Sequence, residues 1–111
     1  MPNIMRGCIP KDETFGQRNP AKFFRRSMLA LVTGDTGFIG TNLKWWLTDA
    51  GISVKCFSRG NGFDVLNRDQ LRHEAQGCGL VYHLAAYANP AESVLKPGYA
   101  IEVNVKGTVN V

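Results

Sequence analysis

The sequence has few of the features that mark secreted, membrane-bound or metal-stabilised proteins. Its 111 residues include only three cysteines, which are widely spaced and form no Cys-x-x-Cys pair: Cys8, Cys56 and Cys78. This pattern indicates reduced thiols in a cytoplasmic protein. A zinc site with His73 and His83 would need a ligand spacing that the sequence does not show, so no metal is expected. No segment approaches the roughly 20 apolar residues of a membrane-spanning helix, so no membrane partner is expected.

The net charge of +4 is confined to the first part of the chain. Residues 1–27 hold six Lys and Arg against two acidic residues, whereas residues 28–111 hold seven of each sign. The domain that follows the basic segment is therefore neutral. Without a basic surface it has no electrostatic reason to bind nucleic acid, and no such partner is expected.

Residues 1–27 are expected to form a disordered or irregular basic leader. They contain three prolines but no hydrophobic periodicity and no apolar stretch of signal-peptide length. Asp12 and Glu13 disfavour a transit peptide, because such peptides contain few acidic residues. A natural start at Met28 is the other explanation for this segment.

Apolar segments alternate with amphipathic ones along residues 28–111. Strands are expected at 28–33, 52–57 and 80–85. The near-continuous apolar character of the last one predicts a parallel strand covered on both faces. Helices are expected at 39–50 and 67–76. A third helix is expected to begin at Asn89 and to stop at Pro97-Gly98, and a fourth to begin near Tyr99. The first helix places its apolar side chains on one stripe: Ile39, Leu43, Trp46, Leu47 and Ala50. The order predicts an α/β fold with a parallel sheet and helices on both faces.

The most informative segment is the glycine-punctuated turn between the first strand and the first helix. It contains Gly34, Gly37 and Gly40. Glycines at this spacing let the backbone turn tightly and approach a pyrophosphate without Cβ clashes. The free N–H groups and the dipole of the following helix then face the phosphate charge. The turn predicts a dinucleotide site, the alternative being a plain strand-to-helix turn.

With the preceding Thr33 and the Phe38-Ile39 insert, this turn resembles that of the extended short-chain dehydrogenase/reductase family. The similarity is to its NAD(P)-dependent epimerase/dehydratase branch. It continues almost to the end of the chain, at Asp64-Val65, His83–Ala86, Glu92–Pro97 and Asn104–Thr108. The resemblance implies the first part of a Rossmann-like sheet with strand order 3-2-1-4.

The third strand of that order must be vestigial here. Only the residues from Arg59 to Phe63 separate the second strand from Asp64, whereas a parallel crossover needs about a dozen residues or more. The strand at 80–85 would then form a bare hydrophobic edge of the sheet. We expect marginal stability for so small a domain.

The resemblance also implies roles for residues at the predicted cofactor site. Asp64 would accept a hydrogen bond from the adenine amino group while Val65 packs on the ring. Leu84-Ala85-Ala86 would let the cofactor lie across a strand end, and Asn104 would contact it near the nicotinamide. The alternatives are a turn or capping role for Asp64 and a hydrogen bond of Asn104 within its own helix. His83, in an apolar strand, is expected to be a core residue.

Ser58 and Arg59 stand where NAD-specific members of the family place an acidic residue for the ribose 2′-hydroxyl. An acid would repel a 2′-phosphate, whereas the planar Arg fork donates hydrogen bonds to it. The sequence therefore favours NADP over NAD, the alternative being a solvated surface Arg. Asp35 stands where Gly or Ala is commoner, and its charge is expected to weaken phosphate binding slightly.

The family's chemistry depends on a Tyr and a Lys four residues later, and this sequence has no such pair. Its tyrosines are followed at that distance by other residues, Ala86, Ala91 and Val103. No catalytic residue is therefore expected. The chain resembles the cofactor-binding part of an enzyme that acts on a nucleotide sugar by transient hydride transfer, truncated inside a helix.

Two other functions stay open at this point. One is a fragment of a steroid- or flavonoid-type ketone reductase with the same fold. The other is a non-catalytic protein that binds a dinucleotide. The nucleotide-sugar substrate, and a possible homodimer, are expected only for a full-length relative.

Overall fold

The computed structural model describes residues 28–111, and the predicted leader lies outside the described residues. Three strands form one parallel sheet in the order β2-β1-β3, with bounds Leu29–Thr33 for β1, Ser53–Phe57 for β2 and Leu80–His83 for β3. The predicted parallel sheet is confirmed, and as expected it forms only part of a Rossmann-like sheet. No strand forms in the described chain between β2 and β3, so the vestigial strand is replaced by a turn.

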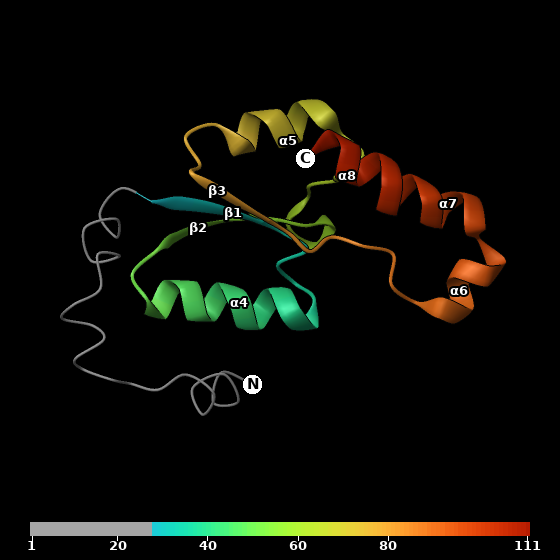
Figure 1. The fold of residues 1–111 in the computed structure, drawn as a ribbon, viewed down its shortest axis with the longest axis horizontal. Helices are drawn as coiled ribbons and strands as arrows, with labels where there is room; N and C mark the ends of the chain where they lie inside the picture. Colours follow the sequence, from blue (N-terminus) through green and yellow to red (C-terminus); the bar gives the residue numbers. More distant parts are fainter. Residues whose placement is uncertain (1–27) are drawn as a thin grey trace.

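The helices lie on both faces of the sheet, as predicted (Figure 1). Helix α4 (Phe38–Asp49) joins β1 to β2 on one face, and α5 (Arg68–Ala75) joins β2 to β3 on the other. The chain then forms α6 (Pro90–Leu95), α7 (Pro97–Ile101), the π-helical turn η2 (Glu102–Lys106) and α8 (Gly107–Asn110). Helix α8 ends on the α5 side of the sheet, where Asn110 Nδ2 donates to the carbonyl of Val65 at 2.8 Å.

The core is split by the sheet because successive strand residues point to opposite faces. Leu31 packs on the α5 side with Phe57 and Leu71. Ala30 and Val32 pack on the α4 side, against a cluster that includes Leu47, Leu43 and Trp46. Burying one such large side chain stabilises a fold by about 1.5–3 kcal/mol. The two clusters fix both helices against the sheet and so fix the loops at its carboxyl edge.

The predicted apolar stripe of α4 is wrong at its start. Ile39 is 64% exposed, whereas Leu47 near the other end of the helix is 1% exposed. The reason is that the first turn of α4 lies against the glycine turn rather than against the strands, as the close approach of Gly40 to Gly34 shows. The core-facing stripe therefore begins at Leu43.

The segment between β2 and α5 is a compact turn. Arg59–Asn61 forms the 3-10 turn η1, which ends at Gly62 with φ +84°. Asn67 then caps α5 by accepting a hydrogen bond from the backbone N–H of Gln70 at 3.1 Å. Capping and the left-handed glycine let the chain reverse without another strand.

Two predicted boundaries are wrong near the end of the chain. Helix α6 ends at Leu95, just before the predicted stop, but Pro97 itself opens α7 ahead of the predicted start near Tyr99, because the first helical position needs no N–H donor. Strand β3 ends at His83, which leaves Leu84-Ala85-Ala86 in a loop. The exposed edge was expected and is confirmed, since within residues 28–111 β3 pairs with β1 alone and Val81 is 41% exposed.

Candidate functional site

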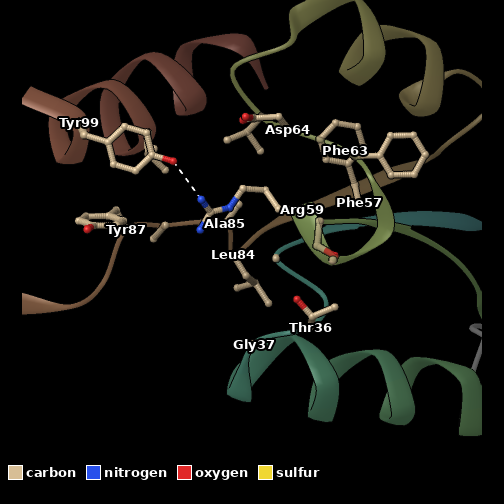
Figure 2. Close-up of a pocket in the computed structure, with 16 residues that line it drawn as sticks. Thr36, Gly37, Phe57, Arg59, Phe63, Asp64, Leu84, Ala85, Tyr87 and Tyr99 are labelled. Atoms are coloured by element: carbon tan, nitrogen blue, oxygen red, sulfur yellow. Dashed lines mark hydrogen bonds between the residues drawn. The ribbon is translucent and has the colours of Figure 1, made fainter. Parts of the chain in front are cut away.

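A cavity of about 330 Å³ opens at the carboxyl ends of the three strands (Figure 2). The connection through α4 runs over one face and that through α5 over the other, so the chain changes side at β1. In open α/β sheets such a switch point is where ligands bind. The cavity is lined by nine of the predicted site residues, Gly34, Gly37, Ser58, Arg59, Asp64, Val65, Leu84, Ala85 and Ala86. Phe38, Ile39, Gly40 and Asn104 do not line it.

Two of the three glycines in the turn are required by packing. Gly34 has φ +70°, and a Cβ there would lie 2.7 Å from the backbone nitrogen of Ala85. A Cβ on Gly40 would lie 2.1 Å from the carbonyl oxygen of Gly34. Both distances are shorter than real Cβ contacts allow. These glycines therefore let β1, α4 and the loop after β3 approach one another closely.

Gly37 is different because it borders open space. A Cβ there would meet only the Gly34 oxygen, at 3.4 Å, and the residue is exposed on the cavity wall. It caps α4 without a side-chain hydrogen bond, and the first turn of α4 holds no acidic residue. The N–H groups of Phe38 and Ile39 have no carbonyl partner within the helix. They give the helix end a partial positive charge beside the cavity.

Asp35 is fully buried and its charge is paired. Lys44 Nζ lies 3.0 Å from one carboxylate oxygen, and Asn61 Nδ2 lies 3.1 Å from both. Burial alone would raise the pKa of Asp35, but the hydrogen bonds from Lys44, Ser58 and Cys56 outweigh burial and hold this pKa below its usual value. The carboxylate thus compensates Lys44 and ties η1 to the glycine turn, and it does not line the cavity.

The loop after β2 presents two of the predicted side chains. Ser58 is buried and accepts a hydrogen bond from Asn61 Nδ2 at 3.0 Å. Arg59 is exposed, and its Nη1 donates to the Tyr99 hydroxyl at 3.0 Å across the cavity mouth (Figure 2). Asp64 lines the cavity, yet its Oδ1 also accepts from the Leu66 N–H at 2.9 Å. The turn role considered for Asp64 is therefore present.

The end of β3 is fixed by a hydrogen-bond network around His83. The backbone N–H groups of Leu84 and Ala85 donate to Thr33 Oγ1 at 3.1 and 3.2 Å. The Thr33 hydroxyl hydrogen is then directed to His83 Nδ1, 2.7 Å away. This assigns the proton to Nε2, which lies 3.0 Å from Thr108 Oγ1. Burial lowers the pKa of His83, and both ring nitrogens are hydrogen-bonded. The residue is half-buried and belongs to neither core cluster, although a core residue was expected.

Asn104 does not bond within its own helix, so that alternative is wrong. Its Oδ1 accepts from the Tyr87 N–H at 2.8 Å, and its Nδ2 donates to the Tyr87 carbonyl at 3.2 Å. The side chain therefore fixes the cavity loop after β3 from the π-helical turn η2. A direct contact of Asn104 with a cofactor stays a prediction.

Several lining residues were not anticipated: Thr36, Phe57, Gly60, Phe63, Tyr87, Tyr99 and Val103. Most are sequence neighbours of predicted residues, and that adjacency was the available signal. The Phe57 and Phe63 rings stack with centroids 5.0 Å apart. Tyr99 and Val103 come from α7 and η2, and no local sequence pattern marks them as cavity residues.

Tyr87 and Tyr99 form an aromatic wall at the mouth of the cavity. Their rings meet edge to face with centroids 5.1 Å apart. The Tyr87 hydroxyl donates to Glu92 Oε2 at 2.6 Å, and this hydrogen bond raises the pKa of Tyr87. The wall is thus anchored to α6 by a charge-assisted bond.

Residues 28–111 contain no group of three or more His, Cys, Asp and Glu side chains that could hold a metal ion. Cys56 and Cys78 are free thiols. Within the same described range, no helix has the length and apolar character needed to cross a membrane.

Comparison with known sequences gives a consistent result. A sequence model of the NAD dependent epimerase/dehydratase family matches residues 30–111. The chain is 34% identical over 97 residues to a 2-alkyl-3-oxoalkanoate reductase of Shewanella oneidensis, covering 74% of this chain and 24% of that protein. It is 31% identical over 109 residues to UDP-glucuronic acid decarboxylase 2 of Arabidopsis thaliana, covering 86% and 24%. The chain thus spans about a quarter of the length of these relatives.

Solved structures show the same fold over a similar range. Epimerase Mth375 of Methanothermobacter thermautotrophicus matches with TM-score 0.71 at 27% identity, over 81% of this chain and 32% of that one. UDP-glucose 4-epimerase of Thermus thermophilus, solved with NAD, matches with TM-score 0.67 at 29% identity. The match covers 75% of this chain and 32% of that one. The dTDP-4-dehydrorhamnose reductase of Bacillus anthracis, solved with NADP, matches with TM-score 0.69 at 23% identity, over 77% of this chain and 31% of that one. At this identity the match supports the fold alone.

Proposed function

This chain belongs to the NAD dependent epimerase/dehydratase family, and we propose that residues 28–111 bind NADP, or NAD with lower affinity, at the carboxyl edge of the sheet. One observation carries the proposal: the glycine turn and the segments after all three strands line one cavity of about 330 Å³. The pyrophosphate, adenosine and nicotinamide parts of a dinucleotide each need their own contact surface, and the segments after β1, β2 and β3 all supply lining residues.

The residues present fit the parts of a dinucleotide. The missing Cβ of Gly37 and the free N–H groups of α4 suit the pyrophosphate. Asp64 and Val65 are proposed for the adenine. Leu84 to Ala86 offer a small-residue surface toward the nicotinamide half, and Asn104 would act there through Tyr87.

The proposed preference for NADP rests on charge at the end of β2. Arg59 lines the cavity, and Asp64 is its only acidic lining residue in the described chain. A charge-assisted hydrogen bond is worth about 1.5–3 kcal/mol, or roughly ten- to a hundredfold in affinity. Related structures have been solved with either cofactor, so the fold allows both, and we propose Arg59 as the residue that favours NADP in this chain.

When bound, the dinucleotide supplies a hydride acceptor and donor. This chain's own residues would bind and orient it, and none is proposed to move the substrate proton, because no Tyr-x-x-x-Lys pair is present. We propose that the chain alone is inactive. A full-length relative would act on a nucleotide sugar, as the names of the decarboxylase and epimerase relatives suggest.

We keep two further functions as alternatives. The oxoalkanoate reductase relative is named for a ketone substrate, which keeps the ketone-reductase alternative in view. A non-catalytic dinucleotide-binding protein would use the same cavity without turnover. If a longer protein that contains this chain binds the dinucleotide but turns over no substrate, the non-catalytic function is favoured.

Calorimetric titration of the full 111-residue chain with NADPH and NADH tests the proposal. Gly37→Val should lower the affinity for both cofactors at least tenfold, because its side chain enters the cavity wall. Gly98→Val is the matched control, since Gly98 does not line the cavity and a Cβ there would have no neighbouring atom within 4 Å. Failure of the wild-type chain to bind either cofactor, or an unchanged affinity in Gly37→Val, would refute the proposed site.

A further inference from the structure

A hydrogen bond between two residues that line the cavity joins two distant parts of the chain. Arg59, in η1 after β2, donates through Nη1 to the hydroxyl of Tyr99 in α7 at 3.0 Å (Figure 2). Arg has five N–H donors, and this bond uses one of them. Tyr99 acts as the acceptor, which leaves its own hydroxyl hydrogen to be donated to another group. The pair therefore presents donors of two kinds at the same place.

Tyr99 is held in position without help from Arg59. Its ring packs edge to face on Tyr87, and the Tyr87 hydroxyl is bonded to Glu92 at 2.6 Å. Asn104 fixes the backbone of Tyr87 through both its N–H and its carbonyl. These contacts place the Tyr99 hydroxyl at the cavity wall before any ligand arrives. An exposed Arg bonded to a fixed hydroxyl then loses fewer rotamers when it binds an anion.

We infer that Tyr99 is a specificity-determining residue that recognises, together with Arg59, a phosphate monoester on the ribose of the cofactor. This inference rests on the proposed function and adds to it a second residue for NADP selection. A monoester phosphate has three terminal oxygens that accept strong hydrogen bonds, so one guanidinium leaves some of them unpaired. The nearby carboxylates accept hydrogen bonds from neutral donors, Glu92 from Tyr87 and Asp64 from the Leu66 N–H. Such bonds do not cancel a carboxylate's charge, so the Arg59 guanidinium has to outweigh both charges.

The test compares ligands that differ only in the 2′-phosphate. The full chain and its Tyr99→Phe variant are titrated with adenosine 2′,5′-bisphosphate and adenosine 5′-monophosphate, and then with NADPH and NADH. Tyr99→Phe should weaken binding of the 2′-phosphorylated ligands about tenfold. Binding of the other two should stay within twofold, because the ring and its contact with Tyr87 are kept. Tyr82→Phe is the control, since Tyr82 packs on the α4 side of the sheet, and it should leave all four affinities unchanged.

A second measurement uses the wild-type chain and does not depend on the variant's folding. With ¹³Cζ-labelled tyrosine, one of the three tyrosine resonances should shift on adding adenosine 2′,5′-bisphosphate and not on adding adenosine 5′-monophosphate. Tyr82→Phe and Tyr87→Phe identify it as that of Tyr99 by elimination. Equal shifts with both ligands would overturn the inference.

The outcomes separate this inference from the proposed function. If the wild-type chain binds none of the four ligands, the proposed function fails and the inference fails with it. Suppose instead that NADPH and NADH both bind to the wild-type chain, and that Tyr99→Phe lowers the two affinities equally or changes neither of them. Then the role of Tyr99 is structural, and only the inference is overturned.

Discussion

The first and last parts of the domain differ in how they use their apolar side chains. From β1 to β2 the large apolar residues of the strands turn inward, and Leu31, Val32 and Phe57 have no exposed surface. From β3 onward most large apolar side chains face outward, and eight of them are 37–80% exposed: Leu80, Val81, Val94, Leu95, Ile101, Val105, Val109 and Val111. The first part buries large apolar side chains of its strands, although Phe38 and Ile39 of α4 are exposed, whereas the last part presents most of its large apolar side chains at the surface.

The two parts also contribute to the cavity in different ways. The first supplies mostly backbone, through glycines whose missing side chains allow close approach. The last supplies side chains, including Tyr87 and Tyr99, that are held by hydrogen bonds and ring contacts rather than by a core. We therefore expect the first part to determine whether the protein folds. The last part should contribute to the cofactor preference through Tyr99, which meets Arg59 from the segment between the two parts.

The largest expected effect is at the closest contact in the first part. Gly40→Val places a side chain where even a Cβ would lie 2.1 Å from the backbone oxygen of Gly34. Backbone cannot yield there without moving α4 off the sheet, so a loss of more than about 4 kcal/mol is expected, enough to unfold a marginal domain. Circular dichroism during urea titration measures it. A folded variant with wild-type stability would show that the turn has room for a side chain after all.

A pair of truncations compares the two parts directly. Leu31→Ala removes a fully buried side chain and should cost about 2–5 kcal/mol. Val109→Ala removes one that is 78% exposed and should change stability by less than about 0.5 kcal/mol. Urea midpoints of both variants give the comparison. A large loss in Val109→Ala would mean that the apolar surface of α8 is covered in solution.

The smallest expected effect concerns the bond that joins the two parts. His83 links Thr33 of β1 to Thr108 of α8, and burial lowers its pKa from the usual 6.5. The unfolded chain therefore takes up a proton at a higher pH than the folded one. Stability should be constant above about pH 7.5 and decline as the pH falls through 6.5.

Thermal melting between about pH 8 and about pH 5.5 measures this decline. His83→Gln should reduce the slope, whereas His73→Gln, on the exposed side of α5, should keep it. A slope that is the same in all three proteins would assign the pH dependence to other groups.

Much of the fold was predictable because its signals are local. The apolar strands, the glycine turn and the capped helices each follow from residues within one segment, and the sheet and its flanking helices were confirmed. Errors arose where a neighbour in space decided. Ile39 has the right spacing for a buried stripe, but it is exposed, because the first turn of α4 approaches the glycine turn through Gly40.

The candidate site shows the same division. Residues next to the strand ends were predicted and line one cavity. Asp35 was expected to oppose phosphate, but its pairing with Lys44 and Asn61 depends on α4 and η1 coming together. Asn104 was expected to bond locally or to touch a cofactor, and the structure shows it bonded to a loop 17 residues away.

The strand-turn-helix order, the glycine spacing and the family can be read from the chain alone, because residues near one another carry these signals. The contact of Arg59 with Tyr99, 40 residues later, and the link that His83 makes between β1 and α8 are visible only in the folded molecule. Such contacts depend on how the elements stack around the sheet, and short sequence patterns specify the elements but not the distances between them.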